Sequence, residues 1–335
     1  MTDSLTSSKP AQASETFANS NPQAKSRFIE PVILIRRIAM GIAIATWMVM
    51  AIGSATRVMN AGLACPDWPL CYGSVLPAEQ MNLQVFLEWF HRLVASTVGF
   101  ATIVLFGASW YFRQSLPKWL PWATSGSLSL VVFQGILGGL TVTQLLRFDI
   151  VTAHLGTGLL FFSSLLAITT ALTNQANLMD TRSVSIKFAW LGLTAAVLTY
   201  CQSILGALVA SQWALHQCFA TQDMCIVLNA HLIGVIPATL ASVALVLTVL
   251  LAKVIAPILR FLGSLASLLV IAQVAIGYAT YKLHLQVEPL TIAHQATGSA
   301  LLGTLVCFTV LAFRLTKQAT RLSQTEHNQA QPAIR

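Results

Sequence analysis

Eight long apolar segments follow one another along the chain, and each is bounded by charged or turn-forming residues. A bilayer core of about 30 Å needs about 20 helical residues to cross it, and every segment is long enough. Polar residues within the segments are few, so the pattern predicts transmembrane helices. The expected helices cover residues 36–57, 89–112, 121–145, 150–172, 188–210, 229–252, 258–281 and 291–313.

The composition supports a membrane protein. Of the 335 residues, 56% are hydrophobic and only 9% are charged, which excludes an ordinary soluble domain. The expected fold class is an all-α integral membrane protein with eight transmembrane helices. If the N-terminus is cytoplasmic, fifteen of the nineteen Lys and Arg residues lie on the cytoplasmic side and four on the outer side. Both termini are therefore expected in the cytoplasm, and the net charge of +8 requires no nucleic-acid partner.

The two ends of the chain are polar. Residues 1–30 contain Asp3 and Glu15 and lack the apolar core of a cleavable signal peptide, so a disordered cytoplasmic tail is expected there. Residues 316–335 are expected to form a second loose cytoplasmic tail. Acidic residues are unusual in mitochondrial transit peptides, which favours a bacterial plasma membrane as the location.

Four histidines stand at the outer ends of expected helices. His91 and His154 are 63 residues apart, His231 and His294 are again 63 apart, and each later histidine lies 140 positions after its counterpart. The stretch "TAHLGTG" also resembles "IAHQATG", and Gln-x-x-x-Gly recurs three times. These repeats are residues 152–158 and 292–298, and the pairs Gln134/Gly138, Gln202/Gly206 and Gln273/Gly277.

This spacing predicts a tandem duplication of a four-helix unit. The expected halves are residues 31–176 and 177–315, and because each holds an even number of helices, they are related by a pseudo-two-fold axis along the membrane normal. Each half then brings two imidazoles of similar depth into its interior.

The imidazoles have two interpretations. Any one of them alone is explained by a hydrogen-bonded core histidine, whereas four at matched depth favour ligation of a cofactor. Zinc requires three or four close ligands and a di-iron bundle requires several glutamates, but two imidazoles between apolar walls fit heme iron. The simplest pairing is His91 with His154 and His231 with His294.

Glu88 breaks the repeat. It precedes His91 by three residues and shares its helix face, whereas Leu228 and Thr291 precede His231 and His294 by the same interval. A carboxylate at this depth is a functional candidate, so the first half is expected to be reactive and the second half to transfer electrons or stabilise the fold. The alternative is an interfacial Glu88 paired with Arg92 or Arg57.

Arg57 and Arg92 lie near the same outer surface. A guanidinium there suits a heme propionate, and snorkelling to the membrane interface explains both residues equally well.

Two cysteine pairs lie in outer loops, Cys65 with Cys71 and Cys218 with Cys225. Two disulfides on the oxidising face are the natural inference, with redox activity of the first pair as an alternative. The remaining cysteines and histidines are assigned to packing and to loops or tails; they are Cys201, Cys307, His216, His284 and His327.

The motifs resemble those of the heme A synthase family, membrane enzymes of cytochrome oxidase assembly. The resemblance rests on "GLACPDWPLCYGSVLP" (62–77), "EWFHR" (88–92), "AHLGTG", "NAHLIG" (229–234) and "AHQATG", and it covers residues 36–313. It implies oxidation of the C8 methyl group of heme O to the formyl group of heme A by successive hydroxylations. The upstream heme O synthase and cytochrome oxidase assembly factors are the partners it implies.

The resemblance also implies residue roles. His231 and His294 would ligate a retained heme b, His91 and His154 would bracket the substrate heme, and Glu88 would be the carboxylate needed for conversion. Both cysteine pairs match the outer-loop disulfides of the family.

Two other classes share part of this pattern. A di-heme b-type electron carrier has bis-histidine bundles but no need for a unique Glu88, and a membrane thiol oxidase uses outer cysteine pairs but no matched histidines.

Overall fold

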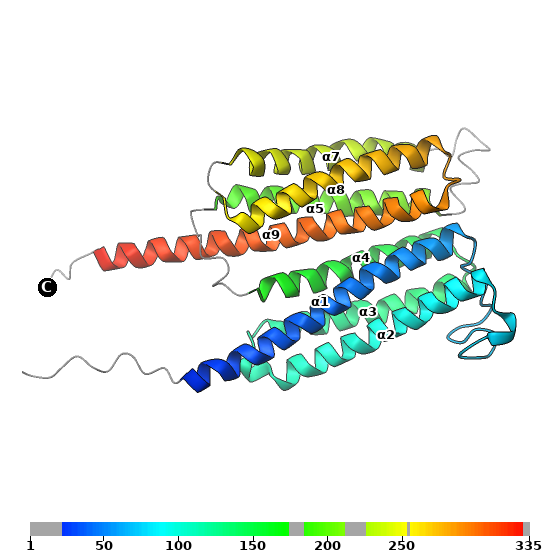
Figure 1. Cartoon of the computed structure of the whole chain (residues 1–335), viewed down its shortest axis with the longest axis horizontal. Coiled ribbons are helices and arrows are strands. Elements are labelled where there is room, and N and C mark those ends of the chain that lie inside the picture. Colours follow the sequence, from blue (N-terminus) through cyan, green and yellow to red (C-terminus); the bar gives the residue numbers. More distant parts are fainter. Residues whose placement is uncertain (1–21, 174–183, 212–225, 253–254, 331–335) are drawn as a thin grey trace, which may run out of the picture.

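The protein is all helical over the residues that its computed structural model describes, which are 22–173, 184–211, 226–252 and 255–330. Eight long helices make up the bundle (Figure 1). They are α1 (Pro22–Val58), α2 (Leu83–Tyr111), α3 (Leu120–Thr143), α4 (Phe148–Ala171), α5 (Ile186–Val209), α7 (Ile226–Leu251), α8 (Pro257–Lys282) and α9 (Glu288–Ala330). Two short 3₁₀ turns, η1 (Ala78–Gln80) and η2 (Arg113–Ser115), flank α2.

All eight long helices are long and apolar enough to cross a membrane, which confirms the predicted multi-pass character. Local sequence explains several starts. Asn82 caps α2 by accepting a hydrogen bond from the Val85 N–H at 3.0 Å, and Ser185 caps α5. Pro121 and Pro257 occupy the first turns of α3 and α8, where a missing N–H costs nothing.

Both expected tails are helical in part, which corrects the sequence analysis. Helix α1 already begins at Pro22, inside the segment expected to be disordered, and α9 continues to Ala330 through the segment expected to be loose. Extending an existing helix needs no new nucleation, and residues 316–330 contain no Gly or Pro. Polarity alone therefore marked the end of the apolar span but not the end of the helix.

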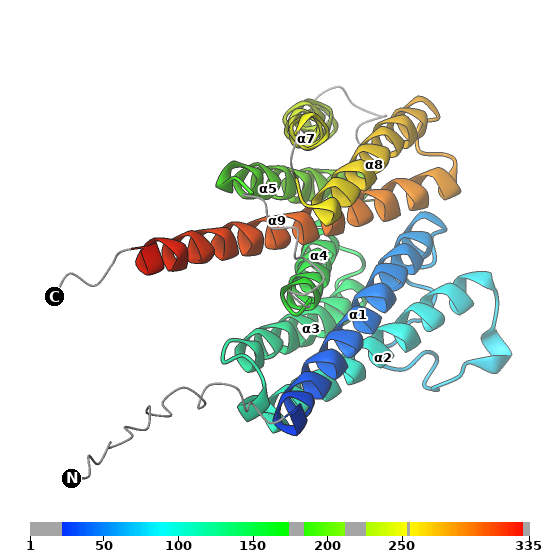
Figure 2. The same ribbon diagram turned by 60° about the vertical axis from the view of Figure 1, so that its left-hand side comes forward.

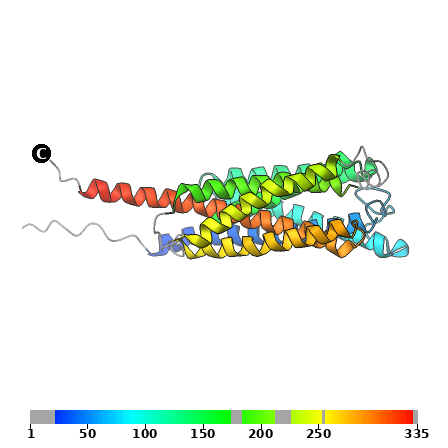
Figure 3. The same ribbon diagram turned by 90° about the horizontal axis from the view of Figure 1, so that it is seen from above.

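The helices form two groups of four. Helices α1 to α4 pack on one another, as do α5, α7, α8 and α9, and Figure 2 shows the two groups side by side. The groups meet through contacts of α9 with α1 and α4 and of α4 with α5. Viewed from above, all the helices follow the long axis of the molecule (Figure 3).

Helix α9 is the most enclosed of the eight. Within an apolar stretch of 18 residues, 61% of its residues are buried, against 22–39% for the corresponding stretches of the other seven helices. Glycines permit its close approach to both groups. Gly303 faces Phe162 and Leu166 of α4, and Gly192 of α5 faces Phe308 and Thr309. Large buried side chains fill the rest of this seam, which makes α9 the shared wall of the two groups.

The bundle end that carries residues 59–82 is called the loop end here. Helices α1, α3, α5 and α8 finish at the loop end, and α2, α4, α7 and α9 begin there (Figure 1). The turns after α3 and α8 each contain two successive residues with left-handed backbone, Leu145–Leu146 and His284–Leu285. The matched turns agree with the expected duplication, whose two-fold relation and membrane orientation remain predictions.

Candidate functional site

The four helix-start histidines share one packing arrangement. Each ring lies against a glycine of a neighbouring helix, so closely that a Cβ at that glycine would stand 2.6–3.4 Å from the histidine Cε1. The pairs are Gly53 with His91, Gly138 with His154, Gly206 with His231, and Gly277 with His294. Because glycine has no side chain, each imidazole packs directly against the backbone of the neighbouring helix. These four glycines are called glycine seats below.

The first group encloses a cavity of about 410 Å³ that both His91 and His154 line. Glu88, Arg92 and Trp68 also line it, and Glu88 is the one carboxylate among the lining residues that the structure describes. Trp68 closes against α3, with its indole ring 3.3 Å from where a Cβ of Gly139 would stand. The structure therefore brings the expected reactive residues of the first half to one cavity.

The second group encloses a cavity of about 350 Å³ lined by His231 and His294. The Gln202 side chain lies 2.9 Å from His231 Nδ1 and donates to the His231 carbonyl at 2.8 Å. The Gln273 amide lies 3.3 Å from His294 Nε2. Thus the Gln-x-x-x-Gly motif of α5 and α8 supplies both the seat and a polar contact for the imidazole.

The two cavities differ in their polar lining. Leu228 lines the second cavity in the position that corresponds to Glu88, and the described part of this cavity's lining contains no carboxylate. On α1, Val49 stands four residues before Gly53, where α3, α5 and α8 carry Gln. The Gln-x-x-x-Gly motif therefore marked Gly138, Gly206 and Gly277 as repeated positions but not Gly53, and the packing of the imidazoles on these glycines was not predicted from the sequence.

Buried polar atoms without hydrogen-bond partners gather at the cavities. Eleven such atoms occur in the described part of the chain, and all but Thr169 Oγ1 belong to cavity-lining residues. They include Nδ1 of His91, His154 and His294. Unpaired buried groups are costly, so their concentration suits a bound ligand with polar groups.

This donor set fits a tetrapyrrole-bound iron better than a bare metal ion. The described residues contain no cluster of three or more His, Cys, Asp and Glu side chains that would hold a metal. Each cavity offers two imidazoles within apolar walls, as heme ligation requires, and both volumes lie in the usual range of ligand pockets, about 300–1,000 Å³.

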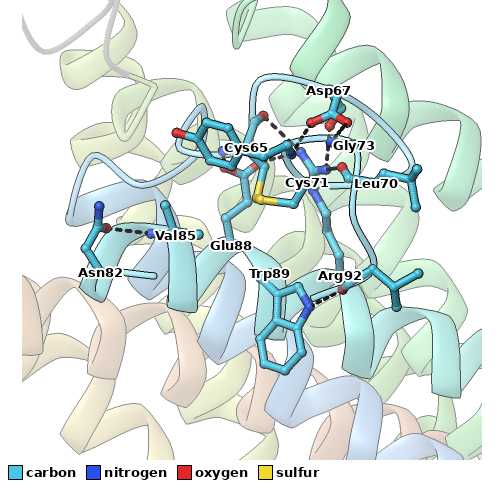
Figure 4. The surroundings of a disulfide bond; sticks show 12 residues. Cys65, Asp67, Leu70, Cys71, Gly73, Asn82, Val85, Glu88, Trp89 and Arg92 are labelled. Atoms are coloured by element: carbon cyan, nitrogen blue, oxygen red, sulfur yellow. Dashed lines mark hydrogen bonds and ion pairs between the residues drawn. A yellow bond between two sulfur atoms is a disulfide. The ribbon is translucent and has the colours of Figure 1, made fainter. Parts of the chain in front are cut away.

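Glu88 is buried, with 4% of its surface exposed, and both its carboxylate oxygens are engaged. Oε1 forms a 2.6 Å ion pair with Arg92 Nη2, and Oε2 accepts a hydrogen bond from the Cys65 N–H at 2.8 Å (Figure 4). The pairing with Arg92 is the one that the interfacial interpretation expected. Each oxygen keeps a second lone pair, so these bonds leave Glu88 able to accept a proton or a further hydrogen bond.

Arg92 is bonded to the loop between α1 and α2. Its Nη1 donates to the carbonyls of Asp67 and Leu70, both at 2.6 Å, and Nη2 lies 3.4 Å from the Cys65 carbonyl (Figure 4). These contacts, with the Glu88 ion pair, occupy both terminal nitrogens. Arg92 therefore has less capacity to hold a propionate than Arg57, the other candidate.

The loop between α1 and α2 is closed by a disulfide between Cys65 and Cys71, as expected. Asp67 accepts hydrogen bonds from the N–H groups of Tyr72 and Gly73 at 2.6 and 2.8 Å, and both these residues have left-handed backbone. The hydrogen bond from Gly73 is the main cause of a lowered pKa at Asp67. The other expected pair, Cys218 and Cys225, lies outside the described residues, as does His216.

The remaining residues take structural positions. Cys201 is exposed on α5, and Cys307 of α9 accepts a hydrogen bond from the Thr170 hydroxyl at 3.3 Å. His284 belongs to the turn after α8. None of the three lines either cavity.

The fold and site thus define a multi-pass helical membrane protein with two histidine-lined cavities, one of them carrying a buried carboxylate. A sequence comparison with protein families matches residues 36–306 to the cytochrome oxidase assembly protein family COX15-CtaA. The chain belongs to this family, as its motifs indicated.

Curated relatives carry the name heme A synthase. The protein from Shouchella clausii is 26% identical over 293 residues, which are 83% of this chain and 96% of the relative. The protein from Geobacillus kaustophilus is 22% identical, covering 89% of this chain and 98% of the relative. The protein from Shewanella oneidensis is 30% identical, and this match covers 52% of this chain and 56% of that relative.

Proposed function

We propose that this protein is a heme A synthase of a bacterial plasma membrane, an oxidoreductase that converts the C8 methyl group of heme O to the formyl group of heme A. The observation that carries the proposal is the pair of histidine-lined cavities, of which only the first has a carboxylate among its described lining residues. The proposal is supported by membership of the family and by two relatives named heme A synthase that match over nearly their whole length.

The first cavity is the substrate site in this proposal. His91 and His154 ligate the heme O iron from α2 and α4, and Gly53 and Gly138 seat their rings. Trp68 and the disulfide-closed loop cover the site at the loop end, which is the outer face of the membrane if the termini are cytoplasmic. This placement exposes the methyl group to Glu88 within a largely apolar cavity.

Glu88 is the catalytic carboxylate. Removing hydrogen from a methyl carbon creates positive character and releases protons, and a nearby carboxylate stabilises the first and accepts the second. The 2.6 Å ion pair with Arg92 and the bond from the Cys65 N–H hold Glu88 in place. The loop therefore has a positioning role.

The second cavity holds a resident heme b through His231 and His294. When bound, this cofactor supplies one-electron redox chemistry beside the substrate site. Gln202 and Gln273 orient the two imidazoles by the contacts described above. Heme O synthase and cytochrome oxidase assembly factors are the proposed partners.

Separate histidine variants test this division of roles. His294→Ala should remove or strongly alter the resident heme spectrum of the purified protein, because it removes one imidazole from the iron. His154→Ala should preserve that spectrum and abolish formation of heme A, measured by chromatography of extracted hemes. A His294→Ala protein with the wild-type spectrum would contradict the assignment of the second cavity.

A further inference from the structure

The two cavities share part of their walls. Arg57 of α1, Leu155 of α4 and Gln295 of α9 line both of them. These residues come from the three helices that hold the two groups together, since α1 and α4 both contact α9. Of the three side chains, only Arg57 carries a charge, so one cation faces both ligand sites.

The Arg57 guanidinium has no partner within the described part of the protein. Its Nε is buried without a hydrogen bond, and no ion pair or hydrogen bond joins its other nitrogens to a described residue. Three other arginines are bonded: Arg92 to Glu88, Arg147 to Asp149, and Arg314 to the carbonyls of Thr170 and Thr173. Burying a cation without a counter-charge costs free energy, so an anion bound at Arg57 would stabilise the folded protein.

Other polar atoms of the cavity walls also lack hydrogen-bond partners. Ser54 Oγ, Thr291 Oγ1 and Gln295 Oε1 are buried without hydrogen-bond partners. Ser54 lines the first cavity and Thr291 the second. Two helices, α1 and α9, therefore contribute unpaired polar groups to the cavities that Arg57 lines.

The described residues of the cavity walls supply no free anion to Arg57. Among the described residues that line the second cavity there is no carboxylate, and Glu88 of the first cavity is paired with Arg92 at 2.6 Å. A ligand that carries negative charge would provide the counter-charge for Arg57. Tetrapyrroles of the heme type carry two propionate carboxylates, and a guanidinium fork with five donors can bind carboxylates on more than one edge.

We propose that Arg57 binds a carboxylate of the tetrapyrrole in each cavity and thereby couples occupancy of the two sites. This inference rests on the proposed function, because it takes both ligands to be hemes. Binding in the first cavity changes the charge around Arg57, and the altered field acts on the redox potential of the heme in the second. Arg57 is a binding and coupling residue in this scheme, with no part in the proton chemistry of Glu88.

The test compares Arg57→Gln and Arg57→Lys with Arg147→Gln, a matched control that removes an outer arginine lining neither cavity. Purified proteins that contain their resident heme are titrated with hemin, whose propionates are free, and with hemin dimethyl ester, whose carboxylates are blocked. The midpoint potential of the resident heme is measured with and without each probe.

Arg57→Gln should weaken hemin binding by roughly tenfold or more, because a charge-assisted carboxylate contact is lost, and should leave ester binding within about twofold of wild type. It should also lower the midpoint potential of the resident heme, since removal of a positive charge disfavours the reduced form. The hemin-induced shift of that potential should disappear. Arg57→Lys should give intermediate values because it keeps the charge without the fork, and Arg147→Gln should match wild type.

Equal weakening of hemin and ester would overturn the proposal, because it would reduce Arg57 to a packing residue. An effect confined to one cavity would also overturn it. If Arg57→Gln does not fold, the comparison of hemin with ester in Arg57→Lys decides. None of these readouts requires heme A formation, so a failure of the proposed reaction is separately visible as heme O that remains unconverted by the wild-type protein.

Discussion

Gly277→Ala adds one methyl group at the point where α8 meets the imidazole of His294. The new Cβ would lie 2.6 Å from His294 Cε1 and 3.2 Å from Nδ1, against an ordinary contact range of 3.4–4 Å. The ring must therefore retreat by about 0.8 Å or more. Alanine is the better helix former by about 1 kcal/mol, so the substitution does not weaken α8 itself.

The displaced ring should lose its contact with Gln273 and its alignment toward the second cavity. Disturbing the groups that orient a metal ligand typically costs on the order of 10- to 100-fold in affinity, so we expect the purified variant to contain much less resident heme. The assay is heme content per protein together with the absorption spectrum of the reduced form.

Gly263→Ala is the matched control on the same helix. Its Cβ would stand at the same 2.6 Å, but from Val249 Cγ1 of α7, so it introduces an equal clash without involving a histidine. It should lower the unfolding temperature and leave the heme spectrum unchanged. A Gly277→Ala protein with wild-type heme content and spectrum would refute the view that the glycine seats position the iron ligands.

Three further outcomes are expected. Glu88→Gln should keep the resident heme spectrum and lower the ratio of heme A to heme O in cell extracts on the order of 10²–10⁴-fold, whereas conversion at the wild-type rate would leave Glu88 as an anchor of the loop. Because the pKa of Asp67 is lowered by the Gly73 and Tyr72 N–H groups, its stabilisation of the loop should be present above the unfolded value of about 4 and lost as pH falls through the lower folded value. Amide-exchange protection of Tyr72 and Gly73 should then fall in acid for wild type and be insensitive to pH for Asp67→Asn; equal acid sensitivity in both would count against this role. Peptide mapping without reductant should recover Cys65–Cys71 and Cys218–Cys225 linkages while Cys201 takes up an alkylating label, and labelling of either pair would contradict the disulfides.

Much of the architecture could be predicted because it depends on local composition. Apolar length located all eight spans, and histidine spacing placed His91 with His154 and His231 with His294 at separate cavities. The unrepeated Glu88 was recognised because a duplication shows directly which position departs from it.

The remaining features depend on how each helix is rotated about its axis. Helices that are apolar on every side have no polar face to fix that rotation, so hydropathy did not show that Arg57 faces both cavities. Arg92 can donate hydrogen bonds to the carbonyls of Asp67 and Leu70 only in a particular loop conformation, which the sequence motif does not specify. The packing of each imidazole on a glycine could not be read from the sequence, and Gly53 did not stand out at all because Val49 occupies the position where the other three motifs have Gln.

The most direct test of heme A synthase activity is co-expression of this protein with a heme O source in cells that make no heme A. Hemes are extracted and separated by chromatography, and their identities are established by mass. The account predicts heme A, with partly oxidised intermediates, in cells carrying the wild-type protein and only heme O and heme b in cells carrying the Glu88→Gln variant at equal abundance. Extracts of wild-type cells that contain heme O and heme b but no heme A or intermediate would contradict it and would favour a di-heme electron carrier.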